Sequence, residues 1–169
     1  MSLLNKLSPK EVFTFFEEIS NIPRTSGNEK QISDYLVSFA KKCELEVYQD
    51  EALNIIIKKP GTKGYENSAP VIIQGHMDMV GEKTSSSSHN FLKDPIKLRI
   101  VDDFLYATDT TLGADDGIAV AYGLAILDAT NLKHPPIELL ITTNEETGMD
   151  GASALTGEHL SGKTMLKVT

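Results

Sequence analysis

Two almost continuous apolar runs, residues 71–74 and 137–143, lie on either side of a stretch of small apolar residues at 118–129. Short apolar runs of this kind predict buried strands, and the stretch between them predicts a helix that can pack on both sides. The order strand, helix, strand predicts an α/β fold with a mixed, partly parallel sheet flanked by helices. Ligands of such sheets bind at the carboxyl ends of the strands, so residues that follow the two runs are candidates for chemistry.

The rest of the chain predicts more elements of the same fold class. Apolar residues recur at helical spacing in two segments, residues 9–20 and 28–43. Ser8 and Glu11 predict a capping box for the first of these helices. Alternating or β-branched runs predict further strands at residues 45–48, 53–58, 96–101, 104–107 and 163–168. The pair at 96–107 is expected to form a hairpin.

Size and charge exclude several classes of protein. A chain of 169 residues suits one domain, and 16 basic against 24 acidic residues give a net charge of −8, which disfavours nucleic acid and anionic membrane surfaces as partners. The longest apolar stretch, residues 118–127, is too short to span a bilayer, and the first 11 residues lack the apolar core of a signal peptide. With Cys43 as its single cysteine, the protein is expected to be soluble and cytoplasmic.

A histidine and an aspartate follow the run at residues 71–74. His76 and Asp78 are two residues apart, and such residues on an extended chain project to the same side. A carboxylate that accepts one ring N–H of a histidine fixes its tautomer and raises the basicity of the other nitrogen, as is usual for a metal-bound imidazole. A buried pair that only satisfies its own hydrogen bonds is the alternative interpretation.

Two acidic pairs lie at the other candidate positions. Asp115 and Asp116 stand between two glycines just before the helix at 118–129, where a carboxylate can cap backbone N–H groups. Only one of the two can cap, so we expect the other to be a ligand. Glu145 and Glu146 follow the run at 137–143, and their side chains point in different directions. One can therefore bind a metal while the other holds a water, although ordinary surface glutamates also occur in such pairs.

These residue types indicate a metal ion of a particular kind. One histidine and several carboxylates without a nearby cysteine suit Zn²⁺ or Mn²⁺ better than a thiolate zinc site. Two ions about 3.5 to 4 Å apart, bridged by an aspartate, would activate a shared water for hydrolysis, with a glutamate as base. No serine-nucleophile elbow, Walker loop or dinucleotide-binding glycine motif is present. The other histidines, His89, His134 and His159, are expected to be ordinary surface residues.

Four segments resemble the co-catalytic zinc peptidases, and within that clan the aminoacyl-histidine (Xaa-His) dipeptidases. They are GHMDMV (75–80), HNFLKDPIKL (89–98), TLGADDGIAVA (111–121) and LLITTNEETGMDGA (139–152). The resemblance spans nearly the whole chain. It implies metal-dependent hydrolysis of Xaa-His dipeptides by a water that two zinc ions activate, with manganese or cobalt as alternative metals.

The resemblance also implies a role for each polar residue. His76 would ligate one zinc ion, and Asp78 would orient His76. Asp115 would bridge the two ions, with an unusual cis peptide bond to the residue that follows it. Glu145 would be the general base, and Glu146 would ligate the second zinc ion.

The chain departs from this family at its end. Such enzymes take a further acidic ligand from just beyond the strand that resembles residues 163–168, a final histidine ligand from near the C-terminus, and a separate lid or dimerisation domain. We therefore expect residues 1–169 to be the N-terminal part of a metallopeptidase catalytic domain, inactive or nearly so by itself. The complete form would act on small peptides and would be a homodimer.

Two other functions fit the same residues. A two-metal phosphoesterase would use the same carboxylates for a different substrate. A truncated paralogue would keep the fold as a binding module without catalysis.

Overall fold

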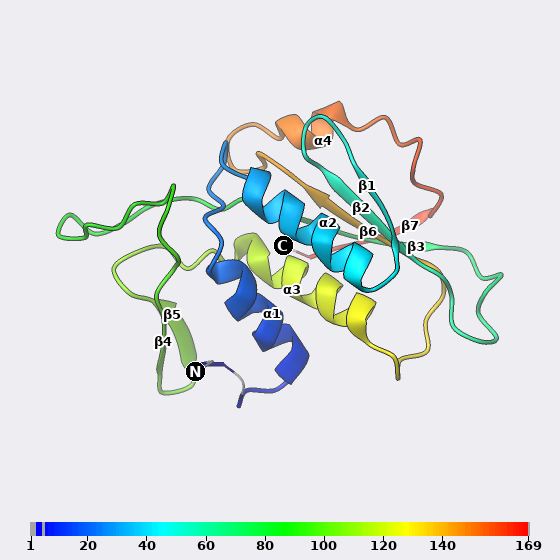
Figure 1. The fold of residues 1–169 in the computed structure, drawn as a ribbon, viewed down its shortest axis with the longest axis horizontal. Coiled ribbons are helices and arrows are strands. Elements are labelled where there is room, and N and C mark those ends of the chain that lie inside the picture. Colours follow the sequence, from blue (N-terminus) through cyan, green and yellow to red (C-terminus); the bar gives the residue numbers. More distant parts are fainter. Residues whose placement is uncertain (1–2, 5, 169) are drawn as a thin grey trace.

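Five strands form the main sheet in the computed structural model, which describes residues 3, 4 and 6–168 (Figure 1). They are β1 (Glu46–Gln49), β2 (Ile55–Lys59), β3 (Val71–His76), β6 (Ile137–Thr142) and β7 (Thr164–Lys167). Their spatial order is β1-β2-β6-β3-β7. β3 runs parallel to β6 and β7, whereas β2 runs antiparallel to β1 and β6. The predicted mixed, partly parallel sheet is confirmed.

The remaining strands and the helices surround this sheet. β4 (Leu98–Val101) and β5 (Phe104–Ala107) form the predicted hairpin as a separate two-stranded sheet. The three long helices, α1 (Lys10–Ser20), α2 (Lys30–Lys42) and α3 (Ala114–Asp128), lie together on one face of the main sheet (Figure 1). The short α4 (Asp150–Ala154) lies at its other side. Among the described residues, no helix is long and apolar enough to cross a membrane.

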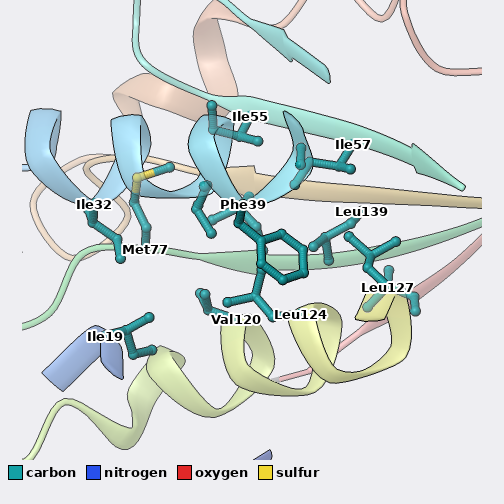
Figure 2. Close-up of a cluster of buried hydrophobic side chains, with 14 of the residues drawn as sticks. Ile19, Ile32, Phe39, Ile55, Ile57, Met77, Val120, Leu124, Leu127 and Leu139 are labelled. Atoms are coloured by element: carbon teal, nitrogen blue, oxygen red, sulfur yellow. The ribbon is translucent and has the colours of Figure 1, made fainter. Parts of the chain in front are cut away.

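Alternation along the strands divides the core between the two faces. Ile55 and Ile57 of β2 pack under the helices, and Ile56 between them packs on the opposite face, because successive side chains of a strand alternate. Figure 2 shows the helix-side cluster, in which side chains from α2 and α3 meet those of the sheet. On the opposite face, Ile56 packs with Ile72, Leu140, Leu155 and Leu160.

The predicted packing of α3 on both sides is confirmed. Val120 and Leu124 join the core against the sheet, while Ala121 and Ala125 pack against α1. Small residues let α3 approach closely, since a Cβ atom at Gly123 would lie 2.5 Å from Cδ1 of Leu139 on β6. The helix is therefore pressed against the strand that leads into one of the polar clusters.

Three local details differ from the prediction. Pro9 occupies the N-cap of α1 and no side chain caps this helix, because Ser8 lies one residue outside the capping position. α3 begins at Ala114 rather than near residue 118, and the backbone of its second and third residues is not helical. α4 was not predicted, since five residues are too few to show a helical period.

Candidate metal centre

The three polar clusters meet at the carboxyl ends of β3 and β6. His76 is the last residue of β3, and its register partner Thr142 is the last residue of β6. The start of α3 lies against β3, which brings Asp115 to the same edge. One ligand atom from each of His76, Asp115 and Glu146 lies within 4.8 Å of the other two. The fold thus brings together the three residues that the sequence analysis assigned as metal ligands.

The two ring nitrogens of the buried His76 contact different carboxylates. Its Nδ1 lies 3.1 Å from the backbone oxygen of Asp78 and 3.3 Å from Oδ1 of the same residue, so Nδ1 carries a hydrogen. Its Nε2 faces the cluster, 3.1 Å from Oδ1 of Asp115 and 3.9 Å from Oε2 of Glu145. Burial lowers the pKa of His76, but the nearby carboxylates outweigh burial and raise this pKa to about 9. A metal ion can replace the proton on Nε2.

The carboxylate of Asp78 is fully buried, and hydrogen bonds within the protein occupy both of its oxygens. Besides His76, it accepts hydrogen bonds from Ser26 Oγ at 2.8 Å and from the backbone N–H groups of Glu145 at 3.1 Å and Glu146 at 3.2 Å. Burial raises the pKa of Asp78, but these bonds outweigh it and lower the pKa to about 2. Both oxygens therefore have partners within the protein, which suits a residue that orients others.

The two aspartates at the start of α3 point in different directions. Asp115 has 72% of its side chain exposed and faces His76. Asp116 is buried, its Oδ2 accepts the backbone N–H of His76 at 3.2 Å, and the backbone N–H of Ala119 also faces its carboxyl group. Burial raises the pKa of Asp116 to about 6. The cis peptide bond that the family resemblance implies is present between the two residues. One aspartate thus serves the backbone, and the other is available to a ligand.

The two glutamates after β6 lie at the partly exposed edge of the cluster. Glu146 offers a carboxylate oxygen to the cluster, while Glu145, with 30% of its side chain exposed, has Oε2 3.9 Å from Nε2 of His76. Burial and the charge of Asp115 raise the pKa of Glu146. Like charges are therefore crowded here in a way that a bound cation would relieve.

The donor set fits a divalent cation. It consists of one imidazole nitrogen and two carboxylate oxygens, with no thiol among the grouped residues, which is the ligand chemistry of Zn²⁺ or Mn²⁺ in a hydrolytic site.

The loop between α1 and α2, to which the sequence analysis assigned no role, contacts the site. Arg24 donates to the backbone oxygens of Met77 and Gly113, and Glu29 accepts the backbone N–H of Asn144. These partners lie between 53 and 115 residues away in sequence, so no local pattern could have revealed them.

One of the other histidines differs from its expected setting. His134 is buried, with 7% of its surface exposed, and Nδ1 lies 2.8 Å from the backbone oxygen of Pro135. Its position directly before two prolines carries no periodic signal that would have indicated burial. His89 and His159 are partly exposed and form ring contacts with Phe91 and Tyr48.

Comparison with known proteins supports the resemblance seen in the motifs. The family model described as peptidase family M20/M25/M40 matches residues 72–167. The chain is 43% identical to the cytosol non-specific dipeptidase of Escherichia coli K12 over 98% of the chain and 34% of that protein. Its structure matches aminoacylhistidine dipeptidase from Vibrio alginolyticus with a TM-score of 0.96 and 41% identity, over 99% of the chain and 34% of that protein.

A tripeptidase from Staphylococcus aureus is a more distant match. Its TM-score is 0.79 at 25% identity, over 96% of the chain and 43% of that protein. The chain spans 34% of the length of each of the two dipeptidases.

Proposed function

This chain belongs to peptidase family M20/M25/M40, and on that premise we propose that the whole protein is a metal-dependent dipeptidase. The observation that carries the proposal is the convergence of His76, Asp115 and Glu146 within 4.8 Å, with Glu145 beside them. Similarity to aminoacylhistidine dipeptidase favours Xaa-His dipeptides as substrates, and the E. coli relative, named non-specific, favours a wider range. That relative is also named a cytosol enzyme, which supports a cytosolic location.

The described residues divide the work as follows. His76 would hold a cation through Nε2, and Asp115 and Glu146 would supply carboxylate ligands beside it. Zn²⁺ suits these donors, with Mn²⁺ or Co²⁺ as substitutes, and the second carboxylate oxygen of Asp115 could serve a second ion. Bound there, the metal would lower the pKa of a water molecule and polarise the peptide carbonyl.

Glu145 is the proposed general base. Its Oε2 lies at the edge of the ligand cluster, and its side chain is open enough to receive a proton from a water and pass it to the leaving amine. Its own backbone N–H is held by Asp78, so the loop that carries the base has a defined position relative to His76. Residues 1–169 would form the N-terminal part of the catalytic domain.

The test compares three forms of the protein, each produced at the full length that its dipeptidase relatives have. Wild type, Glu145→Gln and His76→Ala are assayed with Zn²⁺ for hydrolysis of an Xaa-His dipeptide, a dipeptide without histidine and a phosphomonoester. Zinc binding is measured in parallel by calorimetry. We expect dipeptide hydrolysis in the wild type only, zinc binding retained in Glu145→Gln, and zinc affinity lost in His76→Ala.

Each alternative has its own outcome. Phosphoester turnover without peptide turnover would assign the site to a phosphoesterase, and zinc affinity that His76→Ala leaves unchanged would make the fold a binding module. Dipeptide hydrolysis that survives Glu145→Gln would remove Glu145 from its proposed role.

A further inference from the structure

The loop between α1 and α2 contacts every segment that carries a candidate ligand. Ser26 binds Asp78, and Glu29 binds the backbone of Asn144 at the entrance to the glutamate loop. Arg24 reaches both the end of β3 and the turn before α3. The short loop between α1 and α2 therefore contacts segments that are far apart in sequence.

Arg24 is the member of this loop that joins two ligand segments with one side chain. Its Nη1 donates to the backbone oxygen of Met77 at 2.9 Å, and its Nη2 donates to that of Gly113 at 2.5 Å. Met77 directly follows the ligand His76, and Gly113 lies two residues before the ligand Asp115. A planar guanidinium can make such bonds in two fixed directions, which an ammonium group cannot. Only 2% of the surface of Arg24 is exposed, so the group is enclosed.

Two glycines leave the space that this guanidinium occupies. A Cβ atom at Gly117 would lie 2.5 Å from Nη2 of Arg24, and one at Gly113 would lie 2.7 Å from the same atom. A Cβ atom does not normally approach another atom so closely, so Nη2 would have to shift from the position in which it bonds to the oxygen of Gly113. The glycines on both sides of the aspartate pair therefore make room for Arg24, a role that does not depend on either aspartate.

Charge alone does not account for an arginine at this place. Burial lowers the pKa of Arg24 to about 10, against the opposing effect of Asp78 and Asp116, so the group stays protonated at neutral pH. A buried positive charge disfavours a cation bound nearby, because like charges repel. Its benefit to the site must therefore come from the geometry of its hydrogen bonds.

We propose that Arg24 is a positioning residue that holds the turn before α3 against the end of β3, and so sets the separation of His76 Nε2 and Asp115 Oδ1. The inference rests on the proposed function, because it requires that these two atoms belong to one metal centre. Loss of the bridge would let the two segments move apart without removing any ligand.

The test uses Co²⁺ as the probe, since the visible spectrum of bound Co²⁺ depends on the geometry of its ligands. Arg24→Lys keeps the charge but replaces the two nitrogens of the planar fork with a single ammonium nitrogen on a shorter side chain. Gly117→Ala keeps Arg24 but places a methyl group 2.5 Å from Nη2. The control is Arg99→Lys, which changes an exposed arginine that contacts the ring of Tyr106 on the separate hairpin. For the first two variants we expect Co²⁺ affinity to fall roughly 10- to 100-fold, with an altered spectrum at saturation, and no change in the control.

A second readout needs no metal. The ring NMR shifts of His76, assigned by their loss in His76→Ala, should change in Arg24→Lys and Gly117→Ala because the contact with Asp115 changes. If both folded variants show wild-type ring shifts and the wild-type saturated spectrum, and differ only in thermal stability, the inference is wrong. If the wild-type protein, produced at the full length of its dipeptidase relatives, binds neither Co²⁺ nor Zn²⁺, the proposed function fails, and the ring shifts still decide whether Arg24 sets the contact. Gly117→Ala adds a single methyl group and carries the test if Arg24→Lys does not fold.

Discussion

Asp78 Oδ1 accepts the backbone N–H of Glu145 at 3.1 Å, so the carboxylate that contacts the candidate ligand His76 also holds the loop of the candidate base. The same carboxylate binds the next N–H of that loop and the hydroxyl of Ser26. Four donors therefore converge on one buried charge. A site of this kind couples the position of the ligand to the position of the base.

Asp78→Asn is expected to destabilise the chain and weaken zinc binding together. The amide group replaces an acceptor oxygen with a donor, which leaves buried N–H or O–H groups unpaired at a cost of about 1–3 kcal/mol. Chemical denaturation measures the first effect, and calorimetry measures the second. Asp103→Asn, at the exposed hairpin turn, is the control and should change stability by less than about 0.5 kcal/mol. Equal effects of the two variants would contradict the central place given to Asp78.

The two adjacent glutamates should respond differently to the same substitution. Glu146→Gln removes the charge of a candidate ligand, and we expect the zinc dissociation constant of this variant to rise at least about 10-fold. Glu145→Gln should leave the zinc dissociation constant within roughly threefold of wild type, because that carboxylate is assigned to proton transfer. Zinc titration of both variants by calorimetry is the measurement, and each variant serves as the control for the other. The reverse ranking would exchange the two roles.

Gly75→Ala should disturb the site through the backbone. Its Cβ atom would lie 2.6 Å from Cβ of Ala119 and 2.7 Å from Oδ2 of Asp116, so α3 must move away from β3. Overpacking of this kind costs about 1–3 kcal/mol, and here it should also reduce zinc affinity. Gly123→Ala is the matched control, because it overpacks α3 against Leu139 without touching the site residues.

The measurements for this pair are thermal unfolding and zinc titration. Both variants should unfold at lower temperature, and only Gly75→Ala should bind zinc more weakly. Equal zinc affinity in the two variants would show that the close approach of α3 at residue 75 does not position Asp115.

Glu138 should give the chain a pH-dependent stability that is independent of the metal centre. Burial raises its pKa, but the hydroxyl of Ser161 and the backbone N–H groups of Ser161 and Gly162 outweigh burial and lower the pKa below the ordinary 4.5. A carboxyl group whose pKa is lower in the folded state stabilises fully above its unfolded pKa and loses that contribution as the pH falls through the folded value.

The comparison is between wild type and Glu138→Gln in the absence of metal. The difference in unfolding free energy should be greatest near neutral pH and should shrink as the pH falls from about 6 to about 3. Denaturation at a series of pH values measures it, with Glu51→Gln as an exposed control for the loss of one charge. A difference that stays constant over this range would show that Glu138 is not an ionised anchor for the segment before β7.

Periodicity and motif spacing in the sequence predict most of this fold. The apolar runs of β3 and β6 and the small-residue helix between them predicted the mixed sheet, because burial on both faces requires continuous apolar residues. Local signals failed where the chain is short or irregular. α4 has only five residues, and the start of α3 bends away from helical geometry at Asp115.

The candidate site was predicted as a set of residues, and tertiary structure decided how they are held. His76 and Asp78 are two residues apart at the end of β3, so the sequence could already predict their contact. The division between exposed Asp115 and buried Asp116 depended on how α3 packs on β3. The bridge from Arg24 to Met77 and Gly113 spans 53 and 89 residues of sequence. Contacts at such separations arise only when the whole chain has folded, so the sequence determined which groups are present and the tertiary structure determined their geometry.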